Sequence, residues 1–441
     1  MANLEKGNSK LLNAWAFYDW ANSVYSLVIA SAIFPIFYGA LFKIRGVSYI
    51  DVFGTTLKST ALISFVTAAA FLMVAIISPL LSGIADYVGN KKNFMKFFCY
   101  LGALSCIAMY WFSLEHIYFS LIAYFFGLVG FWGSLVFYNS YLPDIAFPEQ
   151  QDKISAKGFS IGYIGSVLLL IINLAMVMKP EFFGITGTSG EASMKAMRYS
   201  FVMVGIWWIG FSQYTYYYLP KGNKGHKVTK AVVFNGFHEL KKVWNLLEHN
   251  VQLKRFLGSF FVYGMAVQTV MIIAVYFGEQ EISWKSDSEK TTGLIISILL
   301  IQLVAILGAN LTSKASEKFG NITTLIFLNC IWAVLCVVAF FVTSPIEFYS
   351  TAGFVGLVMG GIQALSRSTY SKMLPETDDT ASFFSFYDVS EKIGIVIGMC
   401  IYGIIDQVTG SPRFSIVFLG LFFVTGIFLL SRVKRKIIIA I

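Results

Sequence analysis

Charged side chains are scarce in this sequence. Asp, Glu, Lys and Arg make up 13% of its 441 residues, whereas hydrophobic residues make up 57% and the mean hydropathy is +0.70. Soluble domains carry about 25% charged residues, and a chain this long exceeds one ordinary soluble core. The shortage of charge therefore excludes an ordinary soluble protein.

Residues that build reactive or metal centres are also few. The chain has four His and five Cys, and every Cys lies in an apolar run without metal-ligand spacing. The sequence contains no Gly-rich phosphate loop followed by Lys and Ser or Thr, and no nucleophile elbow. We therefore expect no metal, no cofactor, no ATP-driven transport and no enzymatic activity.

Long apolar runs dominate instead. The first, 16–39, does not resemble a cleaved signal peptide, because it contains Asp19 and no small-residue cleavage site follows it. Runs such as 59–81 and 414–430 have the length that a helix needs to cross about 30 Å of hydrocarbon. We predict an all-α polytopic membrane protein with twelve spans, at 15–40, 59–84, 94–113, 117–138, 159–178, 199–219, 256–278, 292–312, 322–343, 348–369, 383–405 and 413–431.

Basic residues are unevenly distributed over this topology. With the N-terminus inside, the inner segments hold 23 Lys and Arg residues and the outer segments hold nine. The positive-inside rule then places both termini in the cytoplasm, and it accounts for the net charge of +9 without a nucleic-acid partner. The longest inner loop, 220–255, suits an amphipathic helix on anionic lipid, with a calmodulin-like partner site as the alternative.

The two halves of the chain repeat one another. An acid-Gly-Asn pattern after the second span returns 231 residues later, after the eighth, and a Leu-Pro-acid pattern after the fourth span returns 232 residues later. The matched positions are Asp86 and Glu317, Gly89 and Gly320, Asn90 and Asn321, and Asp144 and Glu376. Two nearly equal offsets in equivalent loops indicate a duplicated six-helix unit. We divide the chain into a bundle at 1–219, the basic loop at 220–255 and a second bundle at 256–441.

Parallel six-plus-six repeats are the plan of the major facilitator transporters. The stretch 83–92 resembles the hallmark loop of that superfamily through Gly83, Asp86, Gly89, Lys91 and Lys92. A closer resemblance comes from the stretches AFYDWANSVYS, NSYLPDIA, VQTV, QALSRSTYSKMLPE and FFSFYDVSEKIG. They resemble the Atg22-like vacuole-effluxer family, also called the unknown major facilitator family.

The resemblance implies a twelve-helix transporter, and the fungal vacuolar members of that family are associated with amino-acid efflux. One position departs from the family pattern. Where the resemblance leads us to expect Asn-Asp-Gly ahead of VQT, this chain has YGMA, with Met265 in the acidic position. A coupling role for a carboxylate there cannot be carried over.

A polar stripe runs along the first span. Its members fall at i, i+3, i+4 and i+7, and are Asp19, Asn22, Ser23 and Ser26. Because an Asp at a helix centre costs about 2.5–3.5 kcal/mol to insert, the stripe needs a reason. Either it binds substrate or a proton, or it hydrogen-bonds neighbouring helices. Gln268 and Gln363, on spans expected to face the same cavity, share both interpretations.

Charged residues near the predicted cytoplasmic ends of the later spans suggest a gate. Asp388, Glu391 and Lys392 share one face of the eleventh span, within two turns of its start. Arg367 ends the tenth span, where it either joins the gate or extends to lipid phosphate.

The duplicated loops suggest latches between the halves. We expect Asp86 to hold the start of the eleventh span, through its N-terminal dipole or through Lys392. By symmetry, Glu317 is expected to face Lys157 or the start of the fifth span. We also expect Asp19→Asn to keep stability and to abolish gradient-driven accumulation.

The sequence therefore predicts a secondary active transporter that moves a small solute by alternating access, coupled to H⁺ or another ion. An amino acid or a similar metabolite is the expected substrate, with efflux as one direction. A lipid or amphiphile exporter or scramblase on the same fold is the alternative, and a non-transporting sensor is a third. We expect a monomer in contact with lipids of a bacterial inner membrane.

Overall fold

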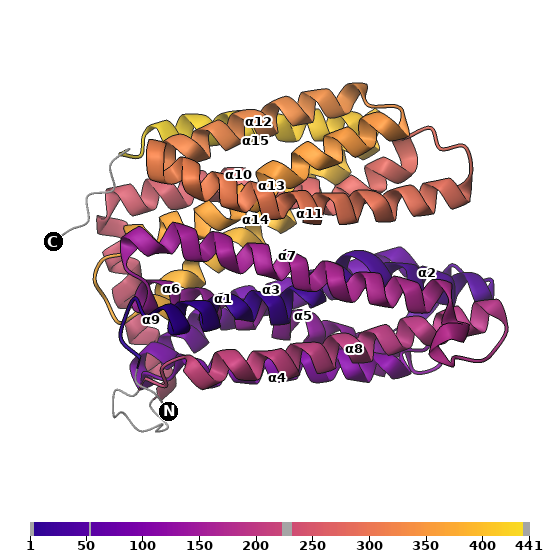
Figure 1. Cartoon of the computed structure of the whole chain (residues 1–441), viewed down its shortest axis with the longest axis horizontal. Coiled ribbons are helices and arrows are strands. Elements are labelled where there is room, and N and C mark those ends of the chain that lie inside the picture. Colours follow the sequence, from indigo (N-terminus) through magenta and orange to yellow (C-terminus); the bar gives the residue numbers. More distant parts are fainter. Residues whose placement is uncertain (1–3, 53, 223–231, 435–441) are drawn as a thin grey trace.

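The computed structural model describes residues 4–52, 54–222 and 232–434. Its long helices run side by side in two bundles, one below the other in Figure 1. The first bundle contains α1 (Ser9–Val24), the π-helical η1 (Tyr25–Ala32), α2 (Ile33–Arg45), α3 (Ser59–Val88), α4 (Lys91–Ala108), η2 (Met109–Trp111), α5 (Ile117–Ser140), α6 (Leu142–Ile145), α7 (Pro148–Met178), η3 (Pro180–Phe183) and α8 (Ser189–Tyr218). After α9 (Val232–His249), the second contains α10 (Val251–Glu281), α11 (Asp287–Phe319), α12 (Asn321–Phe341), α13 (Pro345–Met373), α14 (Thr380–Thr409) and α15 (Pro412–Ser431).

Each bundle has its own hydrophobic core. The first core is built mainly from α1 to α8 around buried rings such as Trp15 and Trp208, and the second mainly from α9 to α15 around Trp332 and Phe423. The outer surface remains apolar, because side chains such as Phe65 stay exposed where lipid would cover them. The two cores agree with a two-bundle division, whose limits at 219 and 256 stay predictions.

Eleven helices in the described part of the chain are long and apolar enough to cross a membrane. They correspond to the predicted spans one to five and seven to twelve, although the third and ninth predicted spans run past the helix ends at Trp111 and Phe341. The predicted sixth span lies in α8, which has 30 residues and packs against α1 and α4 but is more polar, with Gln213 and Thr215 among its last residues. The protein is a multi-pass membrane protein, and the count of twelve stays a prediction.

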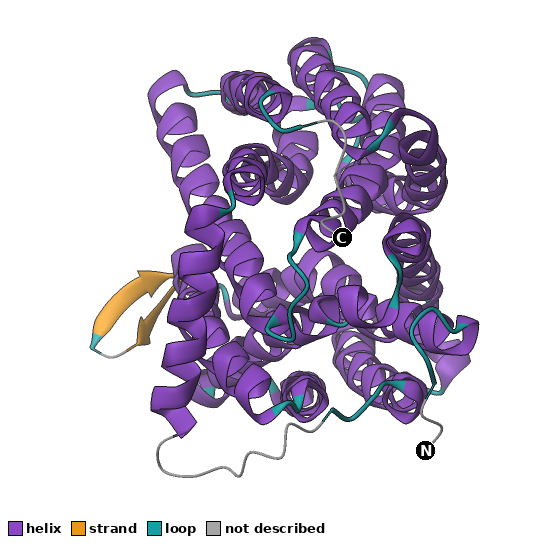
Figure 2. Cartoon of the chain, turned by 90° about the vertical axis from the view of Figure 1, so that its left-hand side faces the viewer, coloured by secondary structure: helices purple, strands orange, loops and turns teal. Residues whose placement is uncertain are grey.

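The prediction of an all-α chain is wrong at one place. β1 (Tyr49–Val52) and β2 (Thr55–Lys58) form an antiparallel hairpin in which Tyr49 lies opposite Lys58. The hairpin protrudes from the side of the helices (Figure 2). Gly54 sits in its turn with a φ of 74°, which glycine adopts without strain. A search for long apolar runs passes over such a short element.

Both chain termini lie at the same end of the bundles, together with α9 (Figure 1). We call this the α9 end, and the other the opposite end. Helix α9 lies across the span ends, with Val243 and Leu247 buried and α3 beside it (Figures 1 and 2). The hydrogen bond that Lys242 donates to Asp379, 2.7 Å long, raises the pKa of the Lys242 ammonium. The structure thus contains the helix expected in the basic loop, and its contact with lipid stays a prediction.

The first span is not a continuous α-helix. Between α1 and α2, η1 winds with the wider π-helical turn, and the Ser31 hydroxyl donates to the carbonyl of Ser26 at 2.9 Å. Wider turns of this kind are frequent at functional sites. Nothing in the apolar pattern of the first span indicated this interruption.

Candidate functional site

A cavity of about 800 Å³ lies between the two bundles. It is lined by residues of α1, η1, α2, α3, α5 and α7 on one side and of α10, α11, α13 and α14 on the other. The cavity extends from Asp19 and Arg367, toward the α9 end, to Glu279 and Lys290, near the opposite end. Its walls are mainly apolar and aromatic, so the polar groups that they contain stand out.

The structure brings the predicted substrate-site residues together. All six line this cavity: Asp19, Asn22, Ser23, Ser26, Gln268 and Gln363. The helical spacing therefore predicted the common face of the first span. Whether these side chains bind a solute stays a prediction.

Arg367 of α13 forms a buried ion pair with Asp19 of α1, across the two bundles. Its Nη2 lies 3.3 Å from Oδ2 of Asp19, and both side chains are more than nine-tenths buried. Its other donors reach Asn139 Oδ1 at 3.2 Å, Ser155 Oγ at 2.9 Å and the Ser155 carbonyl at 3.0 Å. The expectation that Arg367 extends to lipid phosphate is wrong, because all three of its nitrogens bind protein groups.

Aromatic rings enclose this ion pair. The guanidinium carbon of Arg367 lies 4.2 Å from the ring centre of Phe159 and 4.9 Å from that of Trp15. The Tyr138 hydroxyl donates to Asp19 Oδ2 at 2.9 Å. A planar cation among rings and acceptors keeps a fixed geometry, which makes the pair a rigid contact between the bundles.

Two glycines of α7 make room for the pair and the stripe. A Cβ on Gly158 would lie 2.5 Å from Asp19 Oδ2, and a Cβ on Gly162 would lie 2.5 Å from Ser23 Oγ. Both distances are well below van der Waals contact, so only glycine lets α7 approach α1 this closely. The small residues at i and i+4 were visible in the sequence and indicate such an approach.

The remaining polar groups of the cavity have unequal numbers of partners. Gln363 Oε1 accepts a bond from the Tyr163 hydroxyl at 3.0 Å, and Gln268 Nε2 donates to Glu391 Oε1 at 2.6 Å. Asn22 is 1% exposed, and its Nδ2 has no partner among the described residues. Oδ1 of Asp19 likewise accepts no hydrogen bond from the described part of the chain. A free donor and a free acceptor thus lie one turn apart on α1.

A second ionic cluster lies on α14. Lys392 bonds to Oδ1 of Asp388 and, at 3.1 Å, to Oε2 of Glu391. We expected these three residues to form a gate near the α9 end. The structure instead places Glu391 in the cavity wall beside Gln268, because α14 continues inward from its start at Thr380. Met265, which stands where the family resemblance suggested an acid, faces α14, and a Cβ on Gly394 would lie 3.3 Å from its Cβ.

The α9 end is closed by contacts between the bundles, and Asp86 makes the first of them. Its carboxylate accepts bonds from the backbone N–H groups of Ala381 and Ser382, at 3.2 and 2.7 Å, and from the Ser382 hydroxyl at 2.7 Å. A carboxylate at a helix N-terminus is a favourable arrangement. The alternative contact with Lys392 is wrong, since Lys392 bonds to its own helix.

The two neighbouring lysines of the duplicated loop have different roles. Lys91 donates to Asp144 of the first bundle and to Thr380 Oγ1 of the second, and so connects the two. Lys92 is buried and donates to the carbonyl of Leu219 at 2.6 Å, inside the first bundle. Among the described residues, Lys92 makes no contact across the bundles that would support the gate role expected for it.

The symmetry-related latch uses other residues than the predicted ones. Lys157 donates to Asn13, and Glu317 is exposed, so the expected contact between them is wrong. Asp152, near the start of α7, instead accepts bonds from Ser316 at 3.0 Å, Asn321 at 2.9 Å and Lys372 at 2.6 Å. The loop after α11 forms this latch, as predicted, but the acid of the latch lies on α7, the helix that the loop contacts.

The glycines of both loops occupy equivalent positions. Gly89 ends α3 with a φ of 73°, and Gly320 ends α11 with a φ of 81°. Each releases the chain from a helix in a conformation that other residues rarely adopt. Gly83 is buried, one turn before Asp86.

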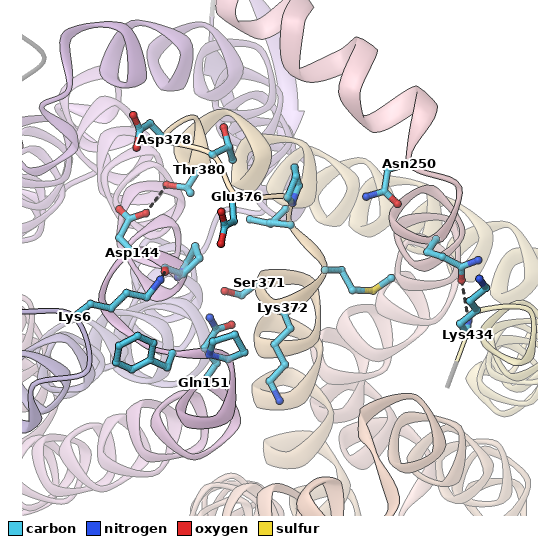
Figure 3. Close-up of a pocket in the computed structure, with 18 residues that line it drawn as sticks. Lys6, Asp144, Gln151, Asn250, Ser371, Lys372, Glu376, Asp378, Thr380 and Lys434 are labelled. Carbon is cyan, nitrogen blue, oxygen red and sulfur yellow. Dashed lines mark hydrogen bonds between the residues drawn. The ribbon is translucent and has the colours of Figure 1, made fainter. Parts of the chain in front are cut away.

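A second hollow, of about 760 Å³, lies at the α9 end beside these contacts (Figure 3). Residues of both bundles line it, among them Asp144 and Lys372 (Figure 3). Thr380 donates to Asp144 at 3.2 Å here, and Lys6 donates to the Pro143 carbonyl at 2.7 Å. The hollow and the cavity have no lining residue in common.

Sequence reasoning missed several residues of the site. Tyr138, Asn139 and Ser155 surround the Asp19–Arg367 pair, and Asp152 forms the second latch. Tyr138 and Asn139 adjoin the repeated Leu-Pro-acid loop, which could have drawn attention to them. No pattern marked Asp152, because it lies in an ordinary charged segment between spans.

Comparisons with known proteins agree with this architecture. The family model described as vacuole effluxer Atg22 like matches residues 7–152 and 147–437. The MFS-type transporter YxiO of Bacillus subtilis is 31% identical over 97% of this chain and 96% of its own. Autophagy-related protein 22 of Eremothecium gossypii is 24% identical over 94% of this chain and 88% of its own.

Solved structures share the fold at low sequence identity. The MFS transporter FucP in its outward conformation has a TM-score of 0.69 at 12% identity, covering 97% of this chain and 99% of its own. The proton:xylose symporter XylE has a TM-score of 0.69 at 12% identity, covering 97% and 96%. These likenesses show the two-bundle fold of MFS transporters.

Proposed function

The chain belongs to the Atg22-like vacuole effluxer family of MFS transporters, and from this premise we propose that it is a secondary active transporter of a small solute. The solute binds between the two bundles and crosses by alternating access, in which the cavity opens first to one side and then to the other. We assign the chain a transport role and no catalytic one.

The observation that carries this proposal is the bundle-bridging ion pair at the closed end of a cavity. The cavity reaches toward the opposite end, whereas Asp86, Asp152 and the Asp19–Arg367 pair hold the bundles together toward the α9 end. With the α9 end in the cytoplasm, as the basic residues predict, this is an outward-facing state. Breaking these bridges would open the other side.

The free groups of α1 indicate the kind of solute. Asn22 Nδ2 requires an acceptor and Asp19 Oδ1 requires a donor, so a molecule that carries both satisfies them together. An amino acid or a similar small metabolite has this chemistry. Gln268 and Gln363 complete the polar wall on the second bundle.

A lipid or amphiphile exporter is the second candidate. The apolar and aromatic lining of the cavity favours it, since residues such as Phe71, Phe131 and Phe260 offer no partner to a polar solute. Such a substrate would place its polar group at Asp19 and its chain along these rings.

We further propose ion-coupled transport by a monomer in contact with membrane lipids, in a bacterial inner membrane. The relative YxiO from a bacterium supports this location, and the titratable residues of the cavity support coupling to H⁺. Efflux remains one direction that this arrangement allows.

A thermal-shift screen tests the proposal and separates the two candidates. The full chain is purified and heated with amino acids, sugars, peptides and lipids, alongside Asn22→Leu and the control Asn329→Leu. Asn329 is also buried but does not line the cavity. We expect a small polar solute to raise the melting temperature of the wild type and of Asn329→Leu but not of Asn22→Leu. Stabilisation by amphiphiles alone would favour the second candidate, and equal stabilisation of all three chains would contradict binding at α1.

A further inference from the structure

The ionic cluster on α14 has an unequal number of charges. Asp388 and Glu391 are two carboxylates, and Lys392 is the one ammonium that both of them share. The side chains of Asp388 and Lys392 are 7% and 1% exposed. If both acids are ionised, the cluster carries one uncompensated negative charge, with Asp388 buried and Glu391 at the cavity wall.

One oxygen of this cluster has no hydrogen-bond donor. Oδ2 of Asp388 is buried and unpartnered among the described residues, whereas Glu391 has a donor on each oxygen, from Gln268 and Lys392. A bare, charged carboxylate oxygen in a buried site is costly, and a bound proton removes the negative charge that makes it so. The geometry therefore selects Asp388, rather than Glu391, as the acid that is protonated.

The neighbouring helices do not supply the missing charge. Among the described residues, the ionic contacts made by the helices that pack on α14 lie elsewhere: Asp86 and the Lys242–Asp379 pair are two turns away at its start, and the pair of Arg413 with Glu281 is at the opposite end. Tyr263 of α10 is neutral and bonds to Ser366. The guanidinium of Arg367 is already paired with the carboxylate of Asp19.

We propose that Asp388 is a proton-binding site of the transporter. The proton is carried on Oδ2 of Asp388 and exchanges with water of the cavity past Glu391, which lines the cavity wall. Loss of the proton to water leaves the carboxylate competing with Glu391 for Lys392. This proposal rests on the proposed transport function and names the group that loads the coupling ion.

The site is connected to the movement between the bundles. Lys392 Nζ lies 3.7 Å from the ring centre of Trp132, which belongs to α5 of the first bundle. A desolvated ammonium on an aromatic face is a favourable contact, and its strength depends on how tightly the carboxylates hold the ammonium. Protonation of Asp388 thus changes a contact between the two bundles.

Infrared difference spectra of the full chain in lipid nanodiscs test this proposal without a substrate. A protonated carboxyl group has a carbonyl band that a carboxylate lacks, so raising the pH should remove that band from the wild-type spectrum. Asp388→Asn should lose the band. Glu391→Gln should lose it too, because one acid and one Lys form a balanced pair that needs no proton. Asp19→Asn, the control, should keep it.

Persistence of the band in both α14 variants, or its absence from the wild type, would overturn the proposal. Loss of the band in Asp19→Asn together with its retention in Asp388→Asn would show that the proton is bound on α1, and would contradict the proposal. Each single α14 variant balances the charge, so both should fold as well as the wild type. The spectrum is independent of transport, and a failure of the proposed function would leave it unchanged.

Discussion

Two buried ionic clusters border the same cavity. They differ in net charge and in whether their ion pairs connect the two bundles. Asp19 and Arg367 come from different bundles and carry equal and opposite charge. Every nitrogen of the arginine donates to a protein acceptor. The cluster around Lys392 lies within α14, holds two acids against one base, and leaves an oxygen of Asp388 without a donor.

In the coupled transport that we propose, this difference separates two tasks. A balanced pair between the bundles holds one conformation and leaves one oxygen of Asp19 for the proposed solute. An unbalanced cluster inside one helix can gain or lose a proton without breaking the closed end. The contrast predicts that substitutions at the first cluster change the stability of the closed state, whereas neutral substitutions at the second change coupling.

The largest effect is expected from Arg367→Leu. It leaves the Asp19 carboxylate buried without its cation, and removing one partner of a buried pair costs about 3–5 kcal/mol. Thermal and denaturant unfolding of the purified chain should show this loss. The double variant Asp19→Leu with Arg367→Leu should recover most of it. A single variant as stable as the wild type would remove the special role of the first cluster.

The next effect concerns Asp86→Asn, which keeps the shape but removes the charge at the start of α14. Hydrogen bonds to charged groups contribute about 1.5–3 kcal/mol each, so the closed α9 end should open more often. The accessibility of a cysteine at Ala364, which is 2% exposed, reports this opening. The repeat-related variant Glu317→Gln is the control, because Glu317 is exposed. Unchanged labelling in Asp86→Asn would contradict the latch.

Gly158→Ala tests how closely α7 packs against Asp19 of the first cluster. The added methyl group would lie 2.5 Å from Asp19 Oδ2, and overpacking of this kind costs about 1–3 kcal/mol. Gly39→Ala is the matched control, because a Cβ there meets nothing within 4 Å. Unfolding free energies of the two variants should therefore differ. Equal values would show that α7 is free to move away from α1.

The smallest effect is expected from Lys242→Ala at the surface of the α9 end. Lys242 is 57% exposed, so water screens its pair with the buried Asp379; such a screened pair contributes about 0–1 kcal/mol, and stability should change little. Because Asp379 raises the pKa of Lys242, the pair contributes fully below the ordinary lysine pKa and is lost as the pH rises through the raised value. Melting temperatures across alkaline pH measure this loss, which Lys242→Ala should lack. A large loss of stability in Lys242→Ala at neutral pH would contradict this expectation and show that α9 supports the fold.

The sequence predicts the polar face of the first span and the loops that close the α9 end. Helical spacing and the repeat are local patterns, and both are readable along the chain. The partner of Asp19 is not, because Arg367 lies 348 residues away and only the packing of both α1 and α13 on α7 brings the two together. For this reason the sequence-based interpretation assigned Arg367 either to the gate or to lipid phosphate, and did not pair it with Asp19.

Two further features depend on packing. The π-helical η1 follows no residue pattern that distinguishes it from an α-helix. Asp19→Asn was expected to keep stability, because the isosteric amide fills the same volume. With Arg367 as its partner, the same variant now leaves a buried cation unpaired, and we expect it to lose stability.

The division of tasks between the two clusters is tested most directly by transport in proteoliposomes. With a solute found in the thermal-shift screen, exchange without a gradient is compared with accumulation driven by a pH gradient, for wild type, Asp388→Asn and Asp19→Asn at matched amounts of folded protein. We predict that Asp388→Asn exchanges the solute as the wild type does but fails to accumulate it, and that Asp19→Asn does neither. Full gradient-driven accumulation by either variant would contradict the account, and in Asp19→Asn it would reduce the polar stripe to helix packing.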